Sequence, residues 1–142
     1  MIHYELDFYG WTQEQAALLK AGRLGELDVM NLIEEIESMG RSERRELQSR
    51  LTVLLVHLLK WKFQPARRGR SWQLTIEEQR ENCLDVLDEN PSLTSKLRDI
   101  LNRAYSHARI TASRETGIDK KDFPTDCPWT YEQMVDGNYY PD

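Results

Sequence analysis

The chain has 142 residues and a mass of 16.8 kDa, which fits a single domain with one hydrophobic core. Hydrophobic residues make up 39% of the sequence and charged residues 30%, a balance that excludes an intrinsically disordered chain. The net charge of −5 opposes general binding to nucleic acids, because such binding depends on a basic surface. We therefore expect one domain over residues 1–142, with nucleic acid left open as a partner but not favoured.

Apolar residues recur at helical spacing along the whole chain, and neither a hairpin turn signal nor an alternating β-branched run occurs. The fold class is therefore expected to be all-α. The first helix is predicted over Asp7–Ala21, with Asp7 or Thr12 as its N-cap. A second helix is predicted to begin near Asp28 and to end or kink at Gly40, with an apolar stripe on one face.

A third helix is predicted to begin at Ser42, and its apolar face is wide enough to indicate a central, buried position. Pro65 ends this helix, because proline cannot continue the backbone hydrogen bonds. After a loop, Ser71 is predicted to cap a fourth helix over about Trp72–Glu89.

The fifth helix is predicted to begin at Asn90 and Pro91, as N-cap and first residue, and to end at Gly117. Thr130 and Gln133 have the spacing of a capping box for a short last helix within a tail rich in aromatic residues. The expected architecture is a single-domain helical bundle of about five main helices, with a short C-terminal helix and an aromatic tail.

Three segments that together cover nearly the whole chain carry a resemblance to a known family. They are DFYGWTQEQAALLKAGRLGELDVMNLIEEIESMGRSERREL, LLVHLLKWKFQPARRGRSWQLTI and ETGIDKKDFPTDCPWTYEQM. In this order they resemble the family named domain of unknown function 29. The resemblance implies a small all-helical protein encoded mostly in bacterial genomes. It implies no reaction, so it assigns no catalytic residue.

Cysteine usage and the N-terminal sequence bear on location. Cys83 and Cys127 lack the spacing of a zinc site or a disulfide framework, which favours a reducing compartment. The first residues lack a secretory signal, and the longest apolar run, Val53–Leu59, is too short to cross a bilayer. We therefore expect a cytoplasmic protein with no membrane partner.

The sharpest feature of the sequence is its uneven charge. The stretch Leu47–Ile76, called the basic segment below, contains six basic residues and no acidic one, a charge of +6. The remaining 112 residues carry 13 basic and 24 acidic side chains, a balance of −11, which together with +6 gives the net charge of −5.

Cations and tryptophans alternate in the basic segment, and these residue types pair with phosphates and stack on bases. They suggest a site for an acidic protein or a phosphate-bearing ligand. The alternative is that the cations pair with acidic helices of this same chain while the tryptophans fill the core. The candidate binding residues are Lys60, Trp61, Lys62, Arg67, Arg68, Arg70 and Trp72.

A second candidate site combines two carboxylates with a histidine. Asp28 and Glu35 flank the apolar stripe of the second predicted helix, and His57 lies in the most apolar stretch of the third. If the two helices face each other, these residues could act as base or metal ligands. The alternative is a solvated or ion-paired helix edge and a satisfied core histidine; no metal is predicted unless Glu35 and His57 hold one.

A basic stripe on the fifth predicted helix could extend the first site. Lys96, Arg103, His107 and Arg114 fall within about 40° of one line on the helical wheel. Arg103 and His107 are the weaker binding candidates here, because the alternative is a solvated helix edge.

Standard enzyme and cofactor motifs are missing from the sequence: nucleotide-binding glycine loops, helical metal-ligand pairs and nucleophile elbows do not occur. No cofactor is therefore predicted, and whether the protein is an enzyme stays open. The leading hypothesis is a binding module that uses the basic segment, and the first alternative is an enzyme that uses the Asp, Glu and His pocket. A further alternative is a homo-oligomer formed through the tail residues Trp129, Tyr131, Tyr139 and Tyr140.

Overall fold

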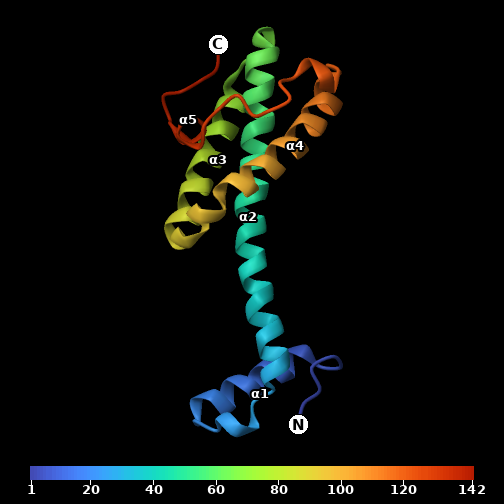
Figure 1. The fold of residues 1–142 in the computed structure, drawn as a ribbon, viewed down its shortest axis with the longest axis vertical. Helices are drawn as coiled ribbons and strands as arrows, with labels where there is room; N and C mark the ends of the chain where they lie inside the picture. Colours follow the sequence, from blue (N-terminus) through green and yellow to red (C-terminus); the bar gives the residue numbers. More distant parts are fainter. The chain divides into compact units, whose positions relative to one another are not determined.

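The computed structural model describes all 142 residues, and every regular element in it is a helix, which confirms the all-α prediction. Short 3₁₀ helices join some of the α-helices. The α-helices are α1 (Phe8–Lys20), α2 (Val29–Phe63), α3 (Arg70–Glu89), α4 (Leu97–Thr116) and α5 (Tyr131–Val135) (Figure 1). None of them combines the length and the apolar character that crossing a membrane requires.

The chain divides into two compact units, an N-terminal unit, Met1–Arg41, and a C-terminal unit, Ser42–Asp142. Helix α2 begins in the first and ends in the second. The prediction of one domain over residues 1–142 stays a prediction.

The N-terminal unit is a pair of helical segments joined by a tight connection. Asp7 caps α1 as predicted, because its Oδ1 accepts a hydrogen bond of 2.9 Å from the backbone N–H of Gly10. Gly22, with φ of +71°, lets the chain turn after α1. Only two side chains of this unit are fully buried, Trp11 and Gln15. The unit therefore has almost no hydrophobic core of its own.

The prediction that a helix ends at Gly40 is wrong, because α2 continues through this residue and is 35 residues long. A glycine inside a helix costs only about 1 kcal/mol relative to alanine. Arg41, the next residue, forms ion pairs with Glu34 at 3.2 Å and with Glu37 at 3.9 Å on the preceding turns. The second and third predicted helices are thus one helix.

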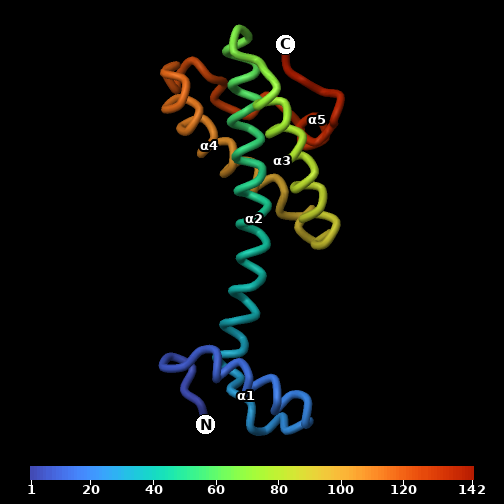
Figure 2. Tube along the Cα trace, turned by 180° about the vertical axis from the view of Figure 1, so that it is seen from behind, coloured from blue at the N-terminus to red at the C-terminus, as the bar shows by residue number.

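The core of the C-terminal unit is centred on the second half of α2, as its wide apolar face predicts. Helices α3 and α4 lie on either side of this half of α2 in both views (Figure 1, Figure 2). Six leucines of α2 are completely buried there: Leu47, Leu51, Leu54, Leu55, Leu58 and Leu59. The hydrophobic effect of these side chains fixes α2 as the central helix of this unit.

Helix boundaries near the prolines and glycines follow the predictions with small shifts. Helix α2 ends just before Pro65, and α4 ends at Gly117, whose φ of +78° fits the expected C-terminal glycine. Helix α3 is capped by Gly69 in place of Ser71, because the Gly69 carbonyl already accepts a hydrogen bond from Gln73 N–H. Pro91 starts a 3₁₀ helix, Pro91–Lys96, that leads into α4.

The C-terminal tail, residues 118–142, packs onto the core of its own unit. The capping box of Thr130 and Gln133 forms as predicted and begins α5. Trp129 is only 7% exposed. Arg80 of α3 is 3% exposed and donates hydrogen bonds to the carbonyls of Met134, at 2.7 Å, and Tyr139. The buried Arg80 side chain thus links the tail to α3 by two hydrogen bonds.

Candidate functional site

Three of the six cations of the basic segment have partners within the C-terminal unit, and the first of them, Arg50, pairs with Glu46 at 2.8 Å. The Lys60 side chain is 13% exposed; its Nζ lies 3.0 Å from Glu115 Oε2 and 5.8 Å from the centre of the Trp72 ring. Arg68 donates a hydrogen bond of 2.6 Å to the Trp61 carbonyl, and its guanidinium lies 5.4 Å from the Trp61 ring. For Lys60, the alternative expectation of an internal ion pair is the one that the structure supports.

Three other cations, Lys62, Arg67 and Arg70, are exposed and make no ion pair or side-chain hydrogen bond. We call them the basic cluster. They lie at the end of α2, in the 3₁₀ helix Pro65–Arg67 and at the start of α3. The turn between two helices therefore presents three positive charges to solvent, none of which has a carboxylate oxygen within 4.0 Å.

The two tryptophans of the predicted site have partners inside the C-terminal unit. The Trp61 ring lies 4.8 Å from the ring of Tyr140, and Lys60 covers the Trp72 ring. Both indoles are half-buried. The part of the predicted binding site that faces solvent is thus the basic cluster.

The two candidate carboxylates, Asp28 and Glu35, belong to the N-terminal unit, where each has a structural partner. Asp28 Oδ2 accepts hydrogen bonds from Asn31 Nδ2 at 2.8 Å and Trp11 Nε1 at 2.9 Å. These bonds, first that of Asn31, lower the pKa of Asp28. Glu35 accepts a hydrogen bond from the Tyr4 hydroxyl, which raises the pKa of Tyr4 to about 12.

His57 belongs to the C-terminal unit and Glu35 to the N-terminal unit, and both lie on α2. The pairing was predicted from two separate helices that face each other, and these two predicted helices are one. A joint site of Glu35 and His57 stays a hypothesis. Nδ1 of His57 lies 2.9 Å from the Val53 carbonyl, one turn earlier. No group of three or more His, Cys, Asp or Glu side chains gathers where it could hold a metal ion.

The environment of His57 leads to a testable pH dependence. Burial lowers the pKa of His57 below its ordinary value of 6.5, and the positive charge of Lys60 acts in the same direction. The unfolded chain therefore binds this proton more readily, so the stability that neutral His57 contributes is present above pH 6.5 and is lost below it. In urea titrations at pH 7.5 and pH 5.5, wild type should lose more stability than His57→Gln. Equal losses would contradict the assignment.

The remaining sequence candidates divide into exposed residues of α4 and aromatic residues of the tail that are packed against the core. Arg103 and His107 are exposed on α4, and neither forms an ion pair or side-chain hydrogen bond. The tail aromatics Trp129, Tyr131, Tyr139 and Tyr140, on which the homo-oligomer hypothesis was based, instead pack against the core of their own unit.

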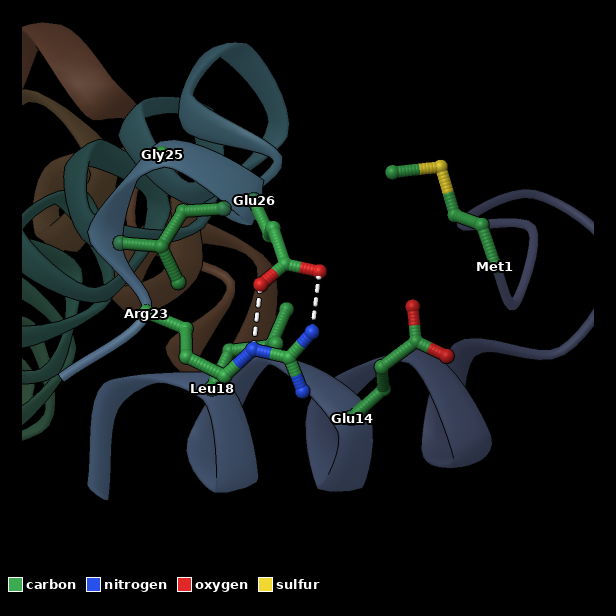
Figure 3. A pocket seen from close by; sticks show the side chains of 7 residues that line it. Met1, Glu14, Leu18, Arg23, Gly25 and Glu26 are labelled. Carbon is green, nitrogen blue, oxygen red and sulfur yellow. Dashed lines mark hydrogen bonds and ion pairs between the residues drawn. The ribbon is translucent and has the colours of Figure 1, made fainter. Parts of the chain in front are cut away.

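The N-terminal unit contains a pocket of about 580 Å³ in which the one basic side chain, Arg23, is already paired with an acid (Figure 3). Arg23 donates two hydrogen bonds to the carboxylate of Glu26, one of them from Nη2 at 2.7 Å. Glu14 stands apart from this pair and accepts hydrogen bonds from the backbone N–H of Ile2. The lining residues include no serine, cysteine, histidine or lysine, and the two carboxylates of the lining, Glu14 and Glu26, both have hydrogen-bond partners.

A second hollow of the N-terminal unit, which we call the apolar groove, was missed by sequence reasoning. It has a volume of about 320 Å³ and is lined by α1 and the first turns of α2. The signal was present in the sequence as an apolar stripe, from which a buried face was expected. The lining residues are Phe8, Trp11, Thr12, Gln15, Ala16, Leu19, Leu32, Glu35, Ile36 and Met39.

Comparison with known proteins bears on identity but not on activity. No curated protein and no solved structure matches the chain. The sequence model described as Domain of unknown function DUF29 matches residues 3–140, almost the full length. The family of the resemblance is thereby confirmed, and no reaction comes with it. The chain belongs to the DUF29 family.

Proposed function

We propose that the chain is a cytoplasmic binding module and that the basic cluster, Lys62, Arg67 and Arg70, contacts an acidic surface of a partner protein. The observation that carries the proposal is the contrast within one segment. Lys60 and Arg68 are used internally, whereas the three residues of the basic cluster have no partner. Guanidinium groups bind carboxylates in a bidentate manner, so arginine suits this role.

Two further observations support the details of this proposal. The net charge of −5 opposes binding to a long polyanion, whereas three clustered cations suffice for a local acidic patch. Both cysteines are free thiols, which suits the reducing cytoplasm. A small phosphate-bearing ligand would use the same guanidinium chemistry and is the second candidate.

The test replaces all three residues of the basic cluster by alanine and measures binding to a polyglutamate peptide by calorimetry at low salt. Exposed ion pairs contribute up to about 1 kcal/mol each, so affinity should fall by about tenfold or more. A control variant removes three exposed cations elsewhere in the chain and has the same net charge. It carries Arg45→Ala, Arg98→Ala and Lys121→Ala.

The control decides between a local site and a general charge effect. An equal loss of affinity in both triple variants would contradict the proposal, because only net charge would then matter. Titration with tripolyphosphate under the same conditions distinguishes the second candidate. Stronger, cluster-dependent binding of tripolyphosphate than of the peptide would replace the acidic protein by a phosphate-bearing ligand.

A further inference from the structure

The N-terminal unit exposes far more apolar side chains than it buries. The chain exposes fifteen large hydrophobic residues, and eleven of them lie in its first 41 residues. In contrast, this unit has only one large hydrophobic residue that is fully buried, Trp11. Contiguous exposed apolar surface usually marks an interaction site. A unit of about this size rarely forms a sufficient core without an additional partner.

The apolar groove gives this surface a defined shape. Its α1 wall comprises residues 8, 11, 12, 15, 16 and 19, whose spacings of three and four place them on one helix face. Its α2 wall comprises residues 32, 35, 36 and 39, again on one face. The α1 wall is about 16 Å long at a rise of 1.5 Å per residue. About three turns of another helix would match this length.

Charge decides what kind of helix fits the apolar groove. The N-terminal unit has eight acidic and three basic residues, a charge of −5, whereas the C-terminal unit has sixteen of each. Arg23 pairs with Glu26, and Arg41 pairs with Glu34 and Glu37. The only charged residue in the lining is Glu35. A second N-terminal unit would be repelled, and a basic partner would be attracted.

We propose that the apolar groove binds an amphipathic α-helix of another protein, with lysine or arginine residues flanking its apolar face. Helix-in-groove recognition of this kind uses apolar anchors at positions i, i+3 or i+4, and i+7 of the bound helix. Phe8, Leu19, Ile36 and Met39 are 50%, 50%, 66% and 67% exposed before binding and would be covered by these anchors. This surface is independent of the basic cluster, which lies in the C-terminal unit.

The test uses the full chain and two synthetic helical peptides. One 14-residue peptide carries leucines at the anchor spacing with lysines on both flanks, and the other has glutamate in place of every lysine. Fluorescence anisotropy of the labelled peptides should show at least tenfold tighter binding of the lysine peptide. The double variant Ile36→Ser, Met39→Ser should weaken that binding at least tenfold. The control Val53→Ser, Ile110→Ser removes two exposed apolar residues of the C-terminal unit and should leave binding unchanged.

Circular dichroism first establishes that each variant keeps its helical content, so that a loss of binding reports the surface. Equal affinity for both peptides, or equal weakening by both double variants, would overturn the proposal. Sedimentation equilibrium of the chain alone tests whether a second copy of the chain occupies the apolar groove instead. A dimer that Ile36→Ser, Met39→Ser dissociates would assign the apolar groove to a second copy and would also overturn it. The alanine variant of the basic cluster should bind the lysine peptide with the same affinity as wild type. This result would separate the present proposal from the function proposed above.

Discussion

Replacing Arg80 by leucine is expected to lower the free energy of unfolding of the C-terminal unit by about 3 kcal/mol. Each hydrogen bond from a charged donor contributes about 1.5–3 kcal/mol, and Arg80 donates one to Met134 and one to Tyr139. Its guanidinium also lies 5.0 Å from the Tyr140 ring. Part of this gain is offset in the native protein, because burial of the charge is itself unfavourable and lowers the pKa of Arg80.

Urea denaturation followed by circular dichroism measures the change, and hydrogen exchange locates it. Exchange should accelerate most in residues 118–142, because the two carbonyls that accept from Arg80 belong to the tail. Arg98→Leu, which changes an exposed arginine on α4, is the control and should have little effect. A loss of less than about 1 kcal/mol for Arg80→Leu would show that the tail is held mainly by its apolar contacts.

Replacing Trp11 by alanine is expected to unfold the N-terminal unit while the core of the C-terminal unit persists. Truncating a buried tryptophan costs about 3–5 kcal/mol, and no other large hydrophobic residue of this unit is fully buried. Trp11 also donates the hydrogen bond that orients Asp28 at the start of α2. The hydrophobic cluster of the protein consists entirely of residues beyond Arg41.

Hydrogen exchange resolved along the sequence measures this effect. Amides of residues 8–39 should lose protection, whereas those of Leu51–Leu59 should keep it. Trp11→Phe keeps an aromatic ring but removes the indole N–H, so it should cause a smaller loss. Unchanged protection of residues 8–39 in Trp11→Ala would mean that other contacts hold the unit together.

The parts of the fold that could be predicted from the sequence depend on neighbouring residues. The Asp7 cap, the helix end before Pro65, the left-handed Gly117 and the capping box of Thr130 and Gln133 all follow from local backbone chemistry. Gly40 was misjudged because the cost of one glycine, about 1 kcal/mol, is small beside the cooperativity of a long helix.

The candidate site was predictable as a segment but not residue by residue. A charge count locates the basic segment, yet some of the groups that bind its cations are distant in sequence. Lys60 pairs with Glu115, and Arg68 also donates to the Pro141 carbonyl, 73 residues away. Arg80 reaches the tail across more than fifty residues. Such partners follow from tertiary packing, which spacing within one helix does not contain.

The apolar stripe of the second predicted helix shows that periodicity also fails to predict which apolar faces are buried. Periodicity identifies Ile33, Ile36 and Met39 as one face of a helix, and it predicts that such a face is covered. In the structure these side chains are 45%, 66% and 67% exposed. The pattern of a helix reports that an apolar face exists, but the element that covers it can belong to another molecule.

The hydrogen bonds between Arg80 and the tail have a consequence for folding during synthesis on the ribosome. The N-terminal unit comprises residues 1–41, whereas the C-terminal unit lacks the two hydrogen bonds of Arg80 until the carbonyls of Met134 and Tyr139 have emerged. At about 5–20 residues per second, translating the intervening hundred residues takes roughly 5–20 s. During that interval the leucines of α2 lack their final cover. The nascent chain therefore exposes apolar surface that favours aggregation until residues 134–139 have been synthesised.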